Sequence, residues 1–172
     1  MKLCFLHGLG SSPQWTKAIM LRGHDPQFWI PTLPPDIYGR VALLERESHE
    51  PMLVVGSSMG GLTALLFAMR HPETVKGILL LAPAVGSYGR NLFSGEEEKV
   101  MASTYIPRAT PTVIIAGVRD ALIPLSSIHA LIKRSPDPER IQLLEVDDDH
   151  DLHQSFDLMI RTIEQIRTKI LI

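Results

Sequence analysis

The sequence lacks the features that mark several other classes of protein. Only one of its 172 residues is a cysteine, so an internal disulfide is excluded. Aromatic residues make up 6% of the chain, and none is interleaved with lysines or arginines as a base-stacking surface requires. The 17 basic and 19 acidic residues give a net charge of −2, with no basic block. The charge pattern therefore points to neither nucleic acid nor an anionic membrane as a partner.

Long hydrophobic runs are also missing. The longest, such as residues 78–85, have the length of a strand and are too short to cross a bilayer. The apolar residues after Met1 are too few for a signal-peptide core, and no small-residue cleavage site follows them. Cys4 lies inside this apolar stretch, so we expect its thiol to be buried and inert. These observations predict a cytoplasmic protein without a membrane span.

The chain does contain enough apolar residues, 45% of the total, to build one hydrophobic core. It has no repeat, low-complexity tract or long linker, so residues 1–172 are predicted to form a single domain. Runs of valine, isoleucine and leucine with little polar alternation are typical of parallel strands buried on both faces. The predicted strands are Lys2–Leu6, Phe28–Thr32, Met52–Gly56, Lys76–Leu81, Thr112–Ala116 and Ile141–Val146.

Stretches with helical spacing lie between these predicted strands. Residues 37–44 place three apolar side chains on one helix face, and residues 156–170 form a longer apolar stripe near the C-terminus. Ser94 followed by Glu97 predicts a capping box at the start of a short helix. The alternation of strands and helices predicts an α/β fold built on an open sheet. Catalytic groups are then expected in loops at the carboxyl ends of the strands.

The segment GSSMG at residues 56–60 follows a predicted strand and precedes a predicted helix. This Gly-x-Ser-x-Gly pattern in a strand–turn–helix context predicts a nucleophile elbow, with Ser58 as the nucleophile. Ser57 does not fit the register, because it lacks glycines two residues before and after it. A glycine-serine turn without chemical function remains an alternative. A phosphate-binding loop is disfavoured, because this turn has no lysine.

The first predicted strand runs into a second glycine-rich loop, HGLG at residues 7–10. Glycines directly after a strand allow backbone N–H groups to point into a site, so we predict an oxyanion hole formed by the N–H groups of Leu9 and Met59. We expect His7 to brace this loop. A dinucleotide site is disfavoured, because Pro13 stands where a third glycine would be required.

A serine nucleophile needs a histidine base, which in turn needs a carboxylate to orient it. Asp120 and His150 each follow a predicted strand, in the chain order of the hydrolase fold. His153 is the competing base, but it lies at the start of the C-terminal helix pattern. The acids at residues 147–149 could replace Asp120, or the cluster Asp147–His153 could bind a metal. We predict Asp120 and His150, and neither a metal nor another cofactor.

Together these motifs resemble the α/β-hydrolase superfamily, and the opening segment with SSP at residues 11–13 resembles the small bacterial YqiA-like esterases. The resemblance implies a compact α/β-hydrolase fold, with a mainly parallel six-stranded sheet flanked by helices on both faces. Only residues 86–105 stand where a cap domain often inserts, so no large cap domain is expected. Ser58, Asp120 and His150 take the catalytic positions, with Leu9 and Met59 at the oxyanion hole.

The implied activity is cleavage of a small-molecule carboxylic ester or thioester through an acyl-enzyme. Two other functions remain open: a ligand-binding protein that keeps the hydrolase fold, and a metal-dependent hydrolase that uses the Asp147–His153 cluster. Oligomeric state is not predicted. The predicted substrate-binding residues are Trp15, Tyr88, Phe93, Leu122 and Ile123.

Overall fold

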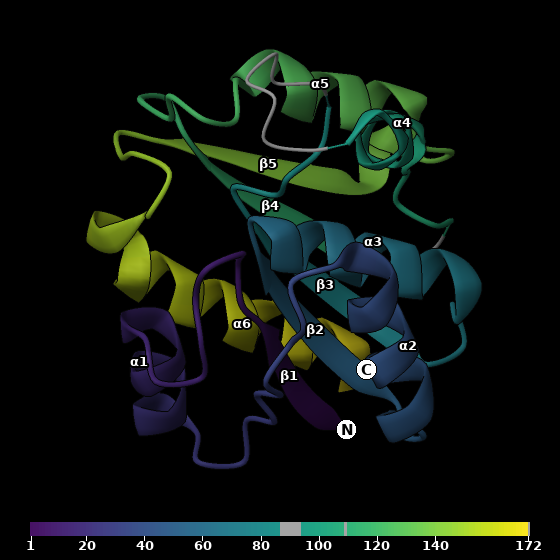
Figure 1. Cartoon of the computed structure of the whole chain (residues 1–172). Coiled ribbons are helices and arrows are strands. Elements are labelled where there is room, and N and C mark those ends of the chain that lie inside the picture. Colours follow the sequence, from purple (N-terminus) through teal and green to yellow (C-terminus); the bar gives the residue numbers. More distant parts are fainter. Residues whose placement is uncertain (87–93, 109, 172) are drawn as a thin grey trace.

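A computed structural model describes residues 1–86, 94–108 and 110–171 (Figure 1). Its core is one five-stranded sheet in the order β1-β2-β3-β4-β5, and every neighbouring pair is parallel. The strands are Lys2–Leu6 (β1), Met52–Ser57 (β2), Val75–Leu81 (β3), Thr112–Gly117 (β4) and Ile141–Val146 (β5). The carboxyl ends of all five strands therefore meet at one edge of the sheet.

Helices cover both faces of this sheet (Figure 1). Within the described ranges the α-helices are Thr16–His24 (α1), Ile37–Glu47 (α2), Met59–Arg70 (α3), Gly95–Ser103 (α4), Leu125–Arg134 (α5) and Phe156–Leu171 (α6). Two short 3-10 helices are Pro138–Arg140 (η1) and His153–Ser155 (η2). Because the strands lie in chain order, right-handed crossovers place α2, α3, α4 and α5 on one face. α1 and α6 pack together on the other.

The side chains of the strands point into two hydrophobic cores, one on each face of the sheet. Successive strand residues point to opposite faces: Val54 lies in the core beneath α2 and α3, whereas Val55 lies in the core beneath α6. All six residues of β2 are buried. This two-sided burial explains why the strand sequences show little polar alternation, and it confirms the predicted α/β class with helices on both faces.

The predicted strand Phe28–Thr32 is wrong, so the described sheet has five strands and not six. Trp29 makes only an isolated bridge to Cys4, in which its N–H donates to the Leu3 carbonyl at 2.8 Å. Pro31 has no N–H to continue the ladder. Phe28 and Ile30 are buried in the core. Core packing beside the edge strand β1, and not sheet pairing, accounts for their apolar character.

Other sequence predictions agree with the structure. α2 buries the apolar face predicted for residues 37–44. Ser94 forms the predicted capping box with Glu97 at the start of α4. Cys4 is fully buried, and burial raises the pKa of its thiol. α4 is the one helix described between β3 and β4, as the expected lack of a large cap domain requires. No helix in the described part of the chain is long and apolar enough to cross a membrane.

Candidate active site

Three polar side chains from different strand ends meet at the carboxyl edge of the sheet. Ser58 follows β2, Asp120 lies in the loop after β4, and His150 lies in the loop after β5. The Nε2 atom of His150 is 3.1 Å from Ser58 Oγ, and its Nδ1 atom is 2.8 Å from Asp120 Oδ2. A carboxylate can only accept, so Nδ1 carries the proton and Nε2 is left to accept from the Ser58 hydroxyl.

Asp120 is held in a nearly closed environment. Its side chain is only 2% exposed, and its Oδ1 atom accepts hydrogen bonds of 2.8 Å from the backbone N–H groups of Leu122 and Ile123. Burial by itself would raise the pKa of this carboxyl, but the hydrogen bonds from His150, Ile123 and Leu122 outweigh it and lower the pKa below its ordinary value. Asp120 is therefore ionised at neutral pH and fixes the orientation of His150.

The backbone at Ser58 is strained in the way the sequence predicts. Ser58 has a φ angle of +53°, a region that non-glycine residues rarely occupy. A Cβ atom at Gly56 would lie 2.6 Å from the carbonyl oxygen of Gly60, and a Cβ at Gly60 would overlap the carbonyl of Leu6. The turn that exposes Ser58 therefore requires glycine on both sides.

Two backbone N–H groups beside Ser58, those of Leu9 and Met59, have no acceptor in the described part of the chain. The Leu9 loop packs directly on the serine, since a Cβ atom at Gly8 would lie 3.4 Å from Ser58 Cβ. Met59 is the first residue of α3, so its N–H also carries the positive end of the helix dipole. The expected oxyanion donors thus flank Ser58.

Several known proteins are similar to this chain in sequence or in structure. A family model described as serine aminopeptidase, S33, matches residues 36–105. Alpha/beta hydrolase domain-containing protein 10 from mouse has a TM-score of 0.80 and 18% identity, covering 98% of this chain and 90% of that one. Est1E from Butyrivibrio proteoclasticus, solved with ferulic acid bound, has a TM-score of 0.73 and 14% identity, covering 99% and 90%. The chain has the α/β-hydrolase fold.

The α/β-hydrolase fold expected from the motifs is thereby confirmed, whereas the likeness to YqiA-like esterases stays a prediction. Lipase LipV of Mycobacterium tuberculosis (strain ATCC 25618 / H37Rv) is 30% identical over 91 residues, which are 52% of this chain and 35% of that protein. This chain therefore matches only about a third of the length of that relative. The segment matched by the family model contains Ser58 but neither Asp120 nor His150.

A buried arginine supports the glycine-rich loop at residues 7–10. Arg40 donates to the backbone carbonyls of Pro34, His7 and Gly8, at 2.7, 2.8 and 3.3 Å. His7 is also buried; its Nδ1 atom lies 2.9 Å from the Gly8 oxygen and its Nε2 atom accepts from the Leu33 N–H. The expected bracing role of His7 thus has a structural basis, and Arg40 is a partner that the sequence analysis missed.

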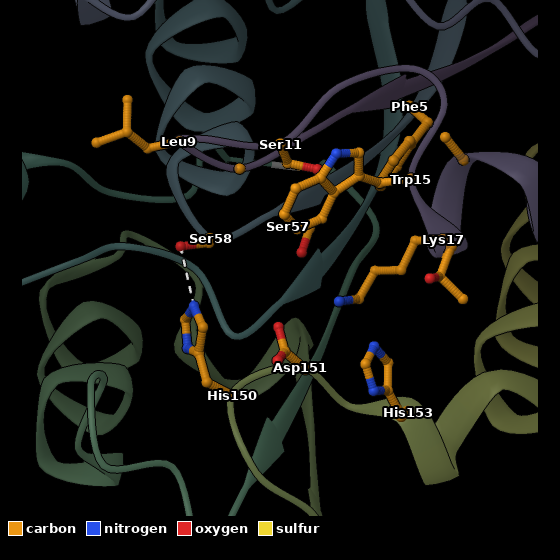
Figure 2. A pocket seen from close by; sticks show the side chains of 13 residues that line it. Phe5, Leu9, Ser11, Trp15, Lys17, Ser57, Ser58, His150, Asp151 and His153 are labelled. Atoms are coloured by element: carbon orange, nitrogen blue, oxygen red, sulfur yellow. Dashed lines mark hydrogen bonds between the residues drawn. The ribbon is translucent and has the colours of Figure 1, made fainter.

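A pocket of about 240 Å³ opens beside Ser58. Figure 2 shows Leu9, Trp15, Lys17 and His153 around it, with the dashed hydrogen bond from Ser58 to His150 at one end. It lies between the glycine-rich loop that carries Leu9, the start of α1 and the loop after β5.

The five predicted substrate-binding residues lie in different places. Trp15 lines the pocket beside Ser58. Leu122 and Ile123 do not line it: Ile123 is buried in the core, and both residues turn their N–H groups to Asp120. Their loop closes around Asp120, and their part in substrate binding stays a prediction. Tyr88 and Phe93 lie outside the described residues.

The acidic segment at residues 147–151 supports the loop that carries His150. Asp148 is buried and accepts from the N–H groups of Asp149 and Gln154 and from the Ser155 hydroxyl, at 2.8–2.9 Å. Asp147 instead pairs with Arg119 at 2.8 Å. In the described part of the chain no group of three or more acidic, histidine or cysteine side chains is arranged to hold a metal ion.

His153, the competing base, lies in η2 and lines the far end of the pocket. Its ring is tilted against that of Phe156, with the two ring centroids 5.7 Å apart. Its ring makes no hydrogen bond with Ser58, so the histidine that the structure brings to the serine is His150.

The sequence analysis missed Lys17, which also lines the pocket. A single lysine shortly after the glycine-rich loop at residues 7–10 forms no motif. Its place beside Ser58 becomes evident only when the loop is folded against the serine.

Proposed function

We propose that this protein is a serine hydrolase that cleaves carboxylic esters or thioesters with Ser58 as the nucleophile. The observation that carries the proposal is the hydrogen-bonded series from Ser58 to His150 to Asp120, at 3.1 and 2.8 Å. A serine hydroxyl is unreactive at neutral pH unless a base and an oxyanion site act on it together. Here His150 and the N–H groups of Leu9 and Met59 lie beside Ser58 at the carboxyl edge of the sheet.

The proposed reaction begins with a proton transfer. His150 Nε2 takes the proton of Ser58 Oγ while the oxygen attacks the substrate carbonyl carbon, and Asp120 stabilises the imidazolium that forms. The carbonyl oxygen becomes an oxyanion that accepts hydrogen bonds from the N–H groups of Leu9 and Met59. The carbon–oxygen or carbon–sulfur bond of the ester then breaks, and the leaving group takes the proton from His150.

The acyl group now on Ser58 is removed by water in the same way. His150 takes a proton from the water, whose oxygen attacks the acyl carbon, and the Ser58 oxygen leaves and regains its proton from His150. The products are an acid and an alcohol or thiol. No step needs a cofactor, so none is proposed.

Covalent labelling tests this proposal directly. A fluorophosphonate probe is expected to add one adduct, which peptide mass spectrometry should locate on the segment that contains Ser58. Ser58→Ala should lose both the adduct and the turnover, apart from a small residual rate. Ser57→Ala should keep the adduct, because no histidine in the described part of the chain forms a hydrogen bond with Ser57. A panel of aryl esters, thioesters and aminoacyl arylamides then defines the bond that is cleaved.

The two other functions make different predictions in the same experiment. A binding protein on the hydrolase fold would bind esters reversibly without labelling or turnover. A metal-dependent hydrolase would lose its activity in a chelator and keep it in Ser58→Ala. The present geometry does not favour a metal-dependent hydrolase, because the His150 ring is occupied by Ser58 and Asp120 and the acids at residues 147–149 are engaged in the loop. The labelling experiment separates the binding protein from the serine hydrolase.

A further inference from the structure

Lys17 stands out in the pocket beside Ser58 because it is a half-buried cation without a partner. It is the second residue of α1 and lines the same pocket as Ser58 and His150. Figure 2 shows its ammonium group pointing into the pocket, beneath Trp15 and toward the catalytic end. Its side chain makes no hydrogen bond or ion pair with any residue in the described part of the chain.

This position is costly for an ammonium group. Burial lowers the pKa of Lys17, although attraction to Asp151, Asp148 and Asp149 acts in the opposite direction. A partly desolvated cation gains most from a ligand that supplies the missing negative charge and hydrogen-bond acceptors. The start of α1 adds to this effect, since its first turn contains no acidic residue and no side-chain cap to offset the helix dipole.

The acids near Lys17 leave it unpaired for identifiable reasons. Asp148 is buried and its two carboxylate oxygens accept three hydrogen bonds from its own loop. Asp149 accepts from the N–H of Asp151. Asp151 is exposed and faces the pocket, but its carboxylate makes no ion pair with Lys17. A ligand anion can therefore approach the ammonium group without displacing an existing salt bridge.

We propose that Lys17 determines substrate specificity by binding an anionic group, a carboxylate or a phosphate, carried by the ester or thioester on the part that extends beneath Trp15. This inference rests on the proposed hydrolase function of Ser58. With the reacting carbonyl between Ser58 and the oxyanion N–H groups, the chain of such a substrate crosses the pocket along Trp15. Its anionic end then meets Lys17.

The test compares pairs of esters of similar shape, one anionic and one neutral, with each rate divided by that of the uncatalysed reaction. Mono-4-nitrophenyl adipate carries a carboxylate in its acyl part, and 4-nitrophenyl 6-methylheptanoate has an isopropyl group in its place. Acetyl esters of 4-hydroxybenzoate and of 4-isopropylphenol place the same difference in the leaving group. For one of these pairs the wild-type protein should favour the anionic ester in kcat/KM by about tenfold or more, the size expected for a hydrogen bond to a charged group.

The variants assign that preference to Lys17. Lys17→Met keeps most of the aliphatic stem and should abolish the preference, because kcat/KM should fall far more for the anionic ester than for the neutral one, mainly through KM. Lys17→Arg should restore most of it. Asp151→Asn should increase it, because a repelling charge leaves the pocket. Lys76→Met is the control: Lys76 is exposed at the amino end of β3, away from the site. Inhibition by adipate and by butyl phosphate then tells a carboxylate site from a phosphate site.

Two results would overturn the inference and leave the hydrolase function intact. One is an equal fall in kcat/KM for the anionic and the neutral ester in Lys17→Met, and the other is the lack of any charge preference in the wild type. If no ester is hydrolysed and Ser58 does not label, the proposed function fails instead. Calorimetric titration of adipate and butyl phosphate into wild type and Lys17→Met then still decides whether Lys17 binds anions, because binding requires no turnover.

Discussion

Arg40 Nη1 donates a hydrogen bond of 2.8 Å to the backbone carbonyl of His7, at the base of the loop that carries Leu9. Arg40 is only 1% exposed. Burial lowers its pKa to about 10, in spite of attraction to Asp36, so the guanidinium group stays protonated at neutral pH. Buried backbone carbonyls need hydrogen-bond donors, and here the Arg40 guanidinium group supplies them in place of water.

Removing this support should impair catalysis as well as stability. Arg40→Met leaves the carbonyls of His7 and Pro34 without this donor and removes one of the donors to Gly8. We expect a loss of about 3 kcal/mol in the free energy of unfolding. Displacement of the Leu9 N–H should lower kcat on the order of 10²-fold with a smaller change in KM. Arg46→Met, on the exposed side of the same helix, is the control. Unchanged kcat in a folded Arg40→Met protein would contradict the positioning role.

Two histidines at the pocket are distinguished by kinetics. His150→Ala should lower kcat/KM about 10³-fold or more, because Ser58 then has no base. His153→Ala should change KM and leave kcat nearly intact, because its ring does not reach Ser58. His129→Ala, on the surface of α5, should behave as the wild type. The assignment is wrong if His153→Ala abolishes turnover while His150→Ala does not.

Asp120 should stabilise the fold in a pH-dependent way. Its folded-state pKa is lowered, so its contribution is complete above the unfolded-state pKa of about 4 and is lost as the pH falls through the folded value. The difference in unfolding free energy between wild type and Asp120→Asn should therefore be constant above about pH 5. At lower pH the wild type should lose stability relative to the variant. Urea unfolding from pH 3 to 7 measures it. A difference that grows on acidification would contradict the lowered pKa.

Glycine at position 60 should be indispensable for a steric reason. In Gly60→Ala the new methyl group would overlap the carbonyl of Leu6 in β1, which cannot move without breaking the sheet. We expect a loss of at least about 2 kcal/mol, or failure to fold. Gly95→Ala, where nothing lies within 4 Å, should be neutral or slightly stabilising. Thermal unfolding of both variants compares them, and equal melting temperatures would rule the explanation out.

Asp148 should matter through the loop that holds His150. Asp148→Ala leaves two backbone N–H groups and the Ser155 hydroxyl without their acceptor, which should cost about 2–4 kcal/mol of stability and lower kcat. Asp147→Ala removes only an exposed ion pair with Arg119 and should cost less than about 1 kcal/mol. Unfolding curves and kcat are measured for both. Equal effects of the two changes would argue against a structural role for Asp148.

Local patterns in the sequence were sufficient for most of the fold and for the nucleophile. Five of the six predicted strands, the capping box at Ser94 and the glycines around Ser58 depend on neighbours close in the chain, so their signals survive without a structure. The exception, Phe28–Thr32, shows the limit of the same reasoning. Its apolar residues are buried, but burial beside β1 and pairing with β1 produce the same pattern.

Tertiary structure alone decided how distant residues combine. Sequence order placed both His150 and His153 near a strand end, and only the geometry of the loop after β5 brings the ring of His150 to Ser58. Arg40 and Lys17 carry no motif, because their roles depend on which carbonyls and which pocket the folded chain sets beside them. Helices, strands and turns depend on residues close together in the chain, so the sequence predicts them. The partners of a buried charge depend on how distant segments pack, so only the tertiary structure shows them.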